Sequence, residues 1–253
     1  MSRQKFWSQV LFYAALVLVW QVLSSTGFWS EKVLPGPWAV AGRLGKFVTD
    51  GSLSQALFLS LGRVMVGYLL ACVLGVSLGL LVFQWDAFSY SFGSMVPGLL
   101  SLPAACWLPL TAIWFAGKPE YAIQLMIILG AVFSIAHATE NGMRQVQPVW
   151  VRAARTMGSR DWNLSLKVQL PAALPAILTG LKQGWTFAWR ALMTGELLST
   201  TLGFGNLLKQ GQKDQDMAAL FGLILVIIAL GYTIDLLVFG PLERKIRLQF
   251  GLE

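Results

Sequence analysis

Long apolar stretches separated by short polar segments dominate the sequence. Six of them approach the 20 or so helical residues needed to cross the roughly 30 Å hydrocarbon core of a bilayer. The predicted spans cover residues 6–23, 64–83, 88–116, 121–139, 170–198 and 217–240. Pro97, Pro103 and Pro109 interrupt the third stretch, which predicts a broken or kinked span. We therefore expect an all-α membrane protein with six transmembrane helices in a single domain, residues 1–253.

The composition agrees with this pattern and narrows the function classes. Hydrophobic residues make up 56% of the 253 residues and charged residues only 12%, so one soluble core could not hide the apolar surface. Cys72 and Cys106 lie in apolar surroundings without a metal-ligand or redox spacing, which favours packing roles. A soluble enzyme, a disordered chain and a disulfide scaffold are excluded.

The distribution of basic residues predicts the orientation. An even number of spans puts both ends on one side of the membrane. If that side is the cytoplasm, the inner segments hold ten Lys and Arg residues and the outer segments six. Positive charge favours the cytoplasmic side, so we expect both termini inside. This topology and anionic lipid headgroups account for the net charge of +7, and nothing points to nucleic-acid binding.

Small residues recur every four positions along two spans, at Gly67, Ala71, Gly75 and Gly79 and again at Gly180, Gly184 and Ala188. Such residues let helix backbones approach closely in lipid, so they predict contact faces. The alternative is that glycine is simply common in membrane helices.

Ionisable residues inside the spans are candidates for function because charge at membrane depth usually faces a cavity or a partner. Arg190 could contact an anion in a translocation path or bond interfacial groups, and Glu196 could pair with another helix or reach the interface. An Arg190–Glu196 pair is not expected, since six helical positions turn them to different faces. Asp235 is expected to pair with a neighbouring helix or to reach the inner interface. The candidate pathway residues are Pro103, Trp107, Pro109, Arg190 and Glu196.

The longest inner segment, residues 141–169, predicts a compact helix–turn–helix. Pro148 can open a short helix and Gly158 can end it. Ser159 or Asp161 can then cap a second short helix, and the chain re-enters the membrane at Leu170-Pro171. From the residues alone, this is either an ordinary basic inner loop or a docking element for a soluble partner.

Residues 152–158, Arg-Ala-Ala-Arg-Thr-Met-Gly, followed at the right distance by Leu170-Pro171, resemble the "EAA" coupling loop of ABC importer permeases. Arg152 stands where that family has Glu. Leu102-Pro103, residues 107–110 and residues 113–115 are similar to the third-span signature of the nitrate, sulfonate, taurine and bicarbonate group.

The resemblance implies a permease subunit with the type I ABC importer fold in the bacterial inner membrane. It implies as partners a second permease copy, two cytoplasmic ATPase subunits and an extracytoplasmic solute-binding protein. ATP and Mg²⁺ would be bound by the ATPase, so we expect no cofactor, metal site or catalytic residue in this chain, which has no phosphate-binding loop. The implied ATPase-coupling residues are Val151, Arg152, Ala153, Ala154, Arg155, Met157, Gly158, Leu170 and Pro171.

The expected function is therefore the translocation pathway of an ATP-driven, binding-protein-dependent importer of a small solute. The resemblance suggests an anion of the nitrate, sulfonate, taurine or bicarbonate class. The alternative is a secondary transporter, or half of one, driven by an ion gradient. In such transporters broken helices bind the substrate at the membrane midplane, and the interrupted third span would be one of these helices. The short chain, the missing inverted repeat and the coupling-loop pattern argue against that alternative.

Overall fold

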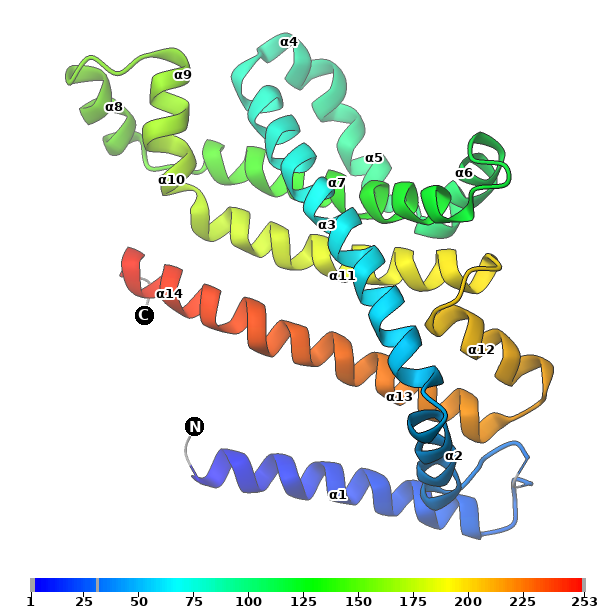
Figure 1. The fold of residues 1–253 in the computed structure, drawn as a ribbon. Coiled ribbons are helices and arrows are strands. Elements are labelled where there is room, and N and C mark those ends of the chain that lie inside the picture. Colours follow the sequence, from blue (N-terminus) through cyan, green and yellow to red (C-terminus); the bar gives the residue numbers. More distant parts are fainter. Residues whose placement is uncertain (1–2, 31, 252–253) are drawn as a thin grey trace. The chain divides into compact units, whose positions relative to one another are not determined.

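The computed structural model describes residues 3–30 and 32–251, with side chains from Trp7 onward. The outermost residues of the expected domain, 1–2 and 252–253, and residue 31 lie outside this description. Helices make up most of the described residues, and no strand occurs among them (Figure 1). The expectation of an all-α chain is confirmed. Contacts divide the chain into two compact units, Met1–Leu59 with Leu202–Ala229, and Ser60–Thr201 with Leu230–Glu253.

The first unit contains α1 (Arg3–Ser25), α2 (Pro37–Thr49), the start of α3 (Ser52–Gln84), α12 (Phe204–Lys213) and most of α13 (Met217–Ile234). Trp20 stacks on Phe221 with ring centroids 6.1 Å apart, and its indole N–H donates to the Pro35 carbonyl at 3.1 Å. Arg43 Nε lies 2.6 Å from Asp216 Oδ2. These contacts hold α1, α2 and α13 together within this unit.

The second unit holds the remaining elements. They are the rest of α3, α4 (Asp86–Phe88), η1 (Ser89–Gly93), α5 (Ser94–Ser101), η2 (Ala104–Trp107), α6 (Leu108–Trp114), α7 (Pro119–Arg144), α8 (Pro148–Thr156), α9 (Asp161–Leu164), η3 (Ser165–Gln169), α10 (Leu170–Ala172), α11 (Leu174–Leu198), the end of α13, η4 (Asp235–Phe239) and α14 (Gly240–Phe250).

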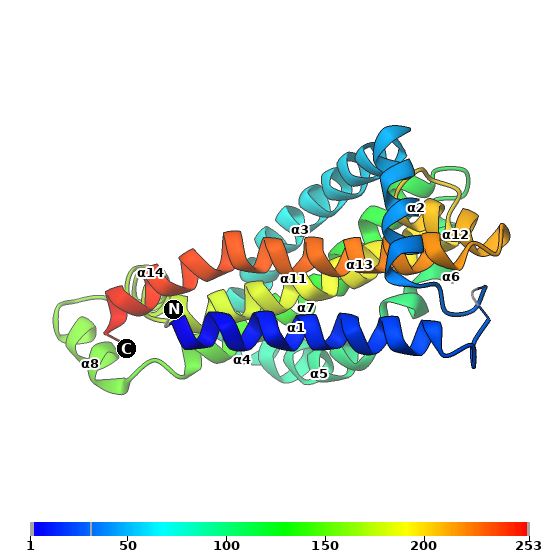
Figure 2. The ribbon, with the colours of Figure 1, turned by 90° about the horizontal axis from the view of Figure 1, so that it is seen from below.

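The core of the second unit lies between α3, α7 and α11. The helices α7 and α11 run side by side in both views, with α8 and α9 at one end of the pair and α6 at the other (Figures 1 and 2). Ile127, Ile135 and Leu192 are fully buried in this core, and Trp185 packs against Tyr68. Tyr68 Oη donates to the Leu181 carbonyl at 2.7 Å, so the one polar atom of that ring is satisfied.

The small-residue stripes lie where these helices meet, as predicted. A Cβ added at Gly75 would come within 2.7 Å of Ile135, and one at Gly184 within 2.7 Å of the same side chain. Gly67 and Gly79 face α7 in the same way. Glycine therefore sets the spacing between α3 and α7 and between α11 and α7.

Candidate spans number four among the described residues, or up to six if each of two bent helix pairs counts as one span. The four are Trp7–Ser25, Ser52–Gln84, Pro119–Arg144 and Met217–Phe250. The broken third span appears as Asp86–Ser101 and Ala104–Trp114, bent by 108°. This bend follows from Pro103, which lacks an N–H and cannot continue the helix.

The fifth span differs from the expected continuous segment 170–198. Asp161–Ala172 and Leu174–Leu198 meet at an angle of 71°. Pro171 and Pro175 flank the bend, and a proline at 175 clashes with the carbonyl four residues earlier in a continuous helix. Helix α3 also begins at Ser52 rather than near Val64, because hydropathy marks only the part of a helix that is strongly apolar.

Candidate functional site

The inner loop forms the predicted helix–turn–helix, α8 followed by α9. Pro148 is the first residue of α8, where its missing N–H costs no hydrogen bond. Gly158 adopts a left-handed conformation with φ of 87°, and the N–H of Ser159 donates to the Ala154 carbonyl at 2.9 Å. Gly158 N donates to the Arg155 carbonyl at 3.0 Å, which completes a Schellman stop. The prediction that Gly158 ends this helix is confirmed.

The predicted cap of the second helix is wrong. Asp161 is the first residue of α9 and has φ of 46°, while Arg160 occupies the N-cap position without a side-chain cap. Asp tolerates the left-handed region better than most residues, so here it makes the turn and does not cap the helix.

The coupling residues divide between two faces of α8. Ala154 is buried against its own chain and Val151 is half-buried. Arg152, Ala153 and Arg155 are exposed, and Met157 is 87% exposed. Ala153 and Met157 therefore offer a small and an apolar surface that the rest of the described chain leaves open, whereas Ala154 fixes the helix to the permease.

A recess of about 400 Å³ lies beside the face of α8 that carries Val151, Arg152 and Arg155. Val151, Arg152 and Arg155 line it together with Phe83 and Arg144, which come from the ends of α3 and α7. Leu170 packs on Met143 and Ile177 in a small cluster, while Pro171 is exposed. The structure thus brings the expected loop residues and Leu170 to one end of the α7–α11 pair.

A second cavity, of about 340 Å³, lies where the third span is broken. Pro103 and Trp107 line it from the break, and Arg190 lines it from α11. Three of the five candidate pathway residues therefore come together. Pro109 and Glu196 do not line this cavity.

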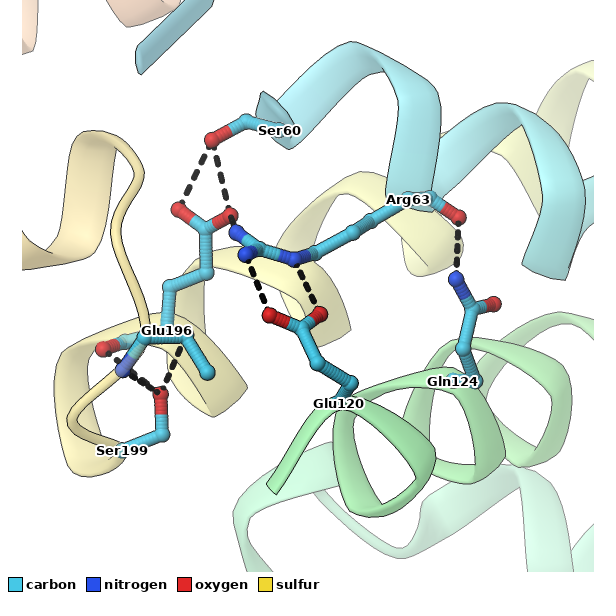
Figure 3. A network of polar contacts seen from close by, with 7 residues as sticks. Ser60, Arg63, Glu120, Gln124, Glu196 and Ser199 are labelled. Atoms are coloured by element: carbon cyan, nitrogen blue, oxygen red, sulfur yellow. Dashed lines mark hydrogen bonds and ion pairs between the residues drawn. The ribbon is translucent and has the colours of Figure 1, made fainter. Parts of the chain in front are cut away.

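Glu196 belongs to a buried polar network instead (Figure 3). Its carboxylate has no exposed surface and accepts hydrogen bonds from Ser60 Oγ at 2.7 and 2.8 Å and from Arg63 Nη1 at 2.7 Å. Arg63 also binds both carboxylate oxygens of Glu120 at 2.6 Å. Glu196 therefore pairs with another helix, one of the two expected possibilities, and not with Arg190.

Sequence reasoning missed the ionic roles of Arg63 and Glu120 in this network. Each stands just before the start of a predicted apolar span, where a charged residue is common and does not by itself indicate an ion pair. The available signal was the carboxylate of Glu196 in an apolar helix, because a buried charge requires a partner of opposite sign. Lys182 Nζ lies 3.0 Å from Asp235 Oδ1, so Asp235 pairs with a neighbouring helix, one of the two expected possibilities.

The fold is that of a known class of transporter subunits. The chain superposes on a chain of the MetNI methionine ABC transporter in an inward-facing conformation with a TM-score of 0.69 and 19% identity. The match covers 78% of this chain and 97% of that one. A second crystal form of the same transporter gives a TM-score of 0.68. The expected type I ABC importer permease fold is confirmed.

Residues 64–247 match the family model "Binding-protein-dependent transport system inner membrane component", and the chain belongs to this family. It is 30% identical to SsuC of Bacillus subtilis, whose name describes an aliphatic sulfonates transport permease, over 94% of this chain and 85% of that protein. It is 31% identical to the taurine transport permease TauC of Escherichia coli, over 76% and 71%. The bicarbonate transport permease CmpB of Synechococcus elongatus is 28% identical over 87% and 82%.

The resemblance drawn from the coupling loop and the third span is therefore confirmed. The chain is a multi-pass membrane permease component of an ABC importer. The secondary-transporter alternative is not favoured by these matches.

Proposed function

We propose that this chain pairs with a second copy to form the translocation pathway of an ATP-driven importer. ATP and Mg²⁺ are bound and consumed by two separate cytoplasmic ATPase subunits, and an extracytoplasmic binding protein delivers the solute. The family membership supports this division of labour. The permease contributes gating and no cofactor chemistry of its own.

The exposed face of α8 carries the proposal. Ala153 offers a small surface that permits close approach, Met157 offers an almost fully exposed apolar side chain, and Arg152 adds charge at the rim. An apolar centre with a charged rim is the usual anatomy of a protein interface. We propose that this face docks into a groove of the ATPase.

The path of the chain supports transmission of a displacement from this face. The segment α9–η3–α10 leads directly from Gly158 to α11, and α11 carries Arg190 into the cavity at the broken span. A movement of α8 driven by the ATPase would therefore reach the pathway through one continuous stretch of backbone.

We place both termini and the α8–α9 loop in the cytoplasm of a bacterial cell and the whole chain in its inner membrane. The excess of basic residues in the inner segments supports this orientation. The C-terminal helix α14 ends on the same side of the second unit as α8 (Figure 2). For the solute, the names of the relatives support a small anion of the sulfonate, taurine, nitrate or bicarbonate class.

The substitution Gly158→Asp tests the docking role. Asp at this position would strain the left-handed turn and place negative charge at the carboxyl end of α8, where the helix dipole disfavours it. We expect the variant to insert in the membrane at the normal level, to lose the ATPase on co-purification and to lose ATP-dependent solute uptake.

Gly27→Asp is the matched control. Gly27 also has a positive φ, of 71°, and, like Gly158, an added Cβ would have nothing within 4 Å. The control should retain ATPase binding and uptake. Normal ATPase binding and uptake by the Gly158→Asp variant would contradict the docking role.

A further inference from the structure

The cavity at the broken third span contains one cation without a counter-charge. Helix α11 carries three ionisable residues, of which Lys182 pairs with Asp235 and Glu196 pairs with Arg63. For the guanidinium of Arg190 the structure records no hydrogen bond or ion pair with any described residue. Of the three ionisable residues of α11, Arg190 is therefore the one whose charge forms no ion pair with another described helix.

The position of Arg190 makes this unpaired charge significant. It lies eight residues before the end of α11, or about 12 Å along the helix axis, and so within the span. A charge at that depth is costly unless it faces a cavity or a partner. Arg190 lines the cavity of about 340 Å³, a volume in the range of roughly 300–1,000 Å³ that is usual for small-molecule sites.

The other walls of the cavity are apolar, aromatic or neutral. Trp107, Phe133 and Phe187 supply ring surface, and none of the lining residues is acidic. The hydroxyls of Ser101 and Thr194 donate to backbone carbonyls of their own helices, at 2.7 and 3.0 Å. Arg190 is therefore the one charged residue that lines this largely hydrophobic space.

We propose that this cavity binds an organic monoanion, with its sulfonate or carboxylate group on Arg190 and an uncharged apolar or aromatic group against Trp107, Phe133 and Phe187. A planar guanidinium matches an oxyanion with two parallel hydrogen bonds. An inorganic anion such as nitrate or bicarbonate would leave the aromatic walls unused. A zwitterion such as taurine would bring an ammonium group to a wall without a carboxylate.

This inference rests on the proposed permease function for its role in transport, and it narrows the solute class that the relatives leave open. The same oxyanion chemistry could be supplied by the phosphate of a lipid headgroup. The experiment therefore compares free solutes in two lipid environments and measures binding separately from uptake.

The test is calorimetric titration of the purified full-length chain in phosphatidylcholine nanodiscs. The probes are benzenesulfonate, propane-1-sulfonate, taurine and nitrate. Propane-1-sulfonate and taurine form a matched pair, because a methyl group in the first replaces the ammonium group of the second. We expect benzenesulfonate to bind most tightly, and both uncharged-tail sulfonates to bind at least about tenfold more tightly than taurine or nitrate.

Three variants locate the site. Arg190→Gln should weaken benzenesulfonate binding by at least about tenfold, and Arg190→Lys should retain part of the affinity because it keeps the charge. Lys46→Gln, which removes an exposed cation on α2 outside the lining, should bind as the unaltered chain does. Unchanged binding by the Arg190→Gln variant would overturn the proposal, as would nitrate or taurine binding as tightly as propane-1-sulfonate.

A second set of nanodiscs containing phosphatidylglycerol separates solute from lipid. Solute affinity that is the same in both lipids supports a solute site, whereas its loss in the anionic lipid assigns Arg190 to a headgroup and overturns the proposal. ATP-dependent uptake is measured in parallel in cells. Intact uptake with no solute binding at Arg190 would refute the cavity site alone, and solute binding without any ATP-dependent uptake would refute the proposed function alone.

Discussion

Arg63 holds two carboxylates from two different helices. It lies on α3, forms a bidentate pair with Glu120 of α7, and donates through Nη1 to Glu196 of α11. The two carboxylates differ in exposure: the Glu120 side chain is 54% exposed and that of Glu196 is fully buried. Water can therefore replace the partner of Glu120 but not that of Glu196.

This difference predicts unequal effects of substitution. Arg63→Met should lower the free energy of unfolding by about 3 kcal/mol or more, because it leaves the Glu196 charge buried without a cation. Glu120→Gln should cost about 1 kcal/mol or less, as is typical of an exposed partner. Thermal unfolding of the purified variants in detergent measures both.

A double variant distinguishes the loss of the Arg63–Glu196 ion pair from the cost of leaving the Glu196 carboxylate buried without a cation. Arg63→Met combined with Glu196→Met removes both buried charges, so it should unfold at a higher temperature than Arg63→Met alone. A double variant no more stable than the single one would show that the buried carboxylate is not the source of the loss.

At the scale of the helix, close approach between α3 and α7 depends on glycine. A Cβ added at Gly79 would lie 2.5 Å from the Ala136 carbonyl oxygen and 2.6 Å from Thr139 Cβ. A Cβ added at Gly62 on the same helix would have nothing within 4 Å. The same substitution therefore has opposite consequences seventeen positions apart.

We expect Gly79→Ala to destabilise the chain by about 1–3 kcal/mol, since the backbone of α7 must move to admit the methyl group. Gly62→Ala should be neutral or stabilising by up to about 1 kcal/mol, because alanine favours the helix. Unfolding midpoints of the two variants, measured side by side, check this. Equal destabilisation by both would show that the spacing is not set by Gly79.

Local signals in the sequence predict where helices begin, end and break better than they predict which helices contact one another. Pro148 and Gly158 mark the ends of α8 because both residues restrict the backbone directly, and Pro103 marks the break in the third span for the same reason. The bend near Ala173 was missed although Pro171 and Pro175 flank it, because the surrounding stretch remains apolar enough to resemble one continuous span.

Contacts between distant residues could not be predicted. Arg63 and Glu196 are separated by 133 positions, and no periodicity links them. The burial of Ala154 could not be predicted from the sequence either, because the side of α8 that faces the permease depends on where α3 and α7 end. The unpaired state of Arg190 became evident only once Lys182 and Glu196 had been assigned their partners.

At the scale of the whole molecule, the proposed function requires one particular orientation of the chain in the membrane. The α8–α9 loop must face the compartment that holds the ATPase, and the connection that contains α12 must face the other. Arg160 lies on the first and Lys213 on the second, and both side chains are exposed. Each position can therefore report the side on which its segment lies.

Cysteine labelling in intact cells tests this orientation. Cys72 and Cys106 are both free, and Cys106 is exposed, so both are first replaced by alanine. In that background, a membrane-impermeant maleimide should label Lys213→Cys in intact cells and Arg160→Cys only after permeabilisation. The reverse pattern would place α8 outside the cell, out of reach of any cytoplasmic ATPase, and would refute the proposed coupling while leaving the fold and the family unchanged.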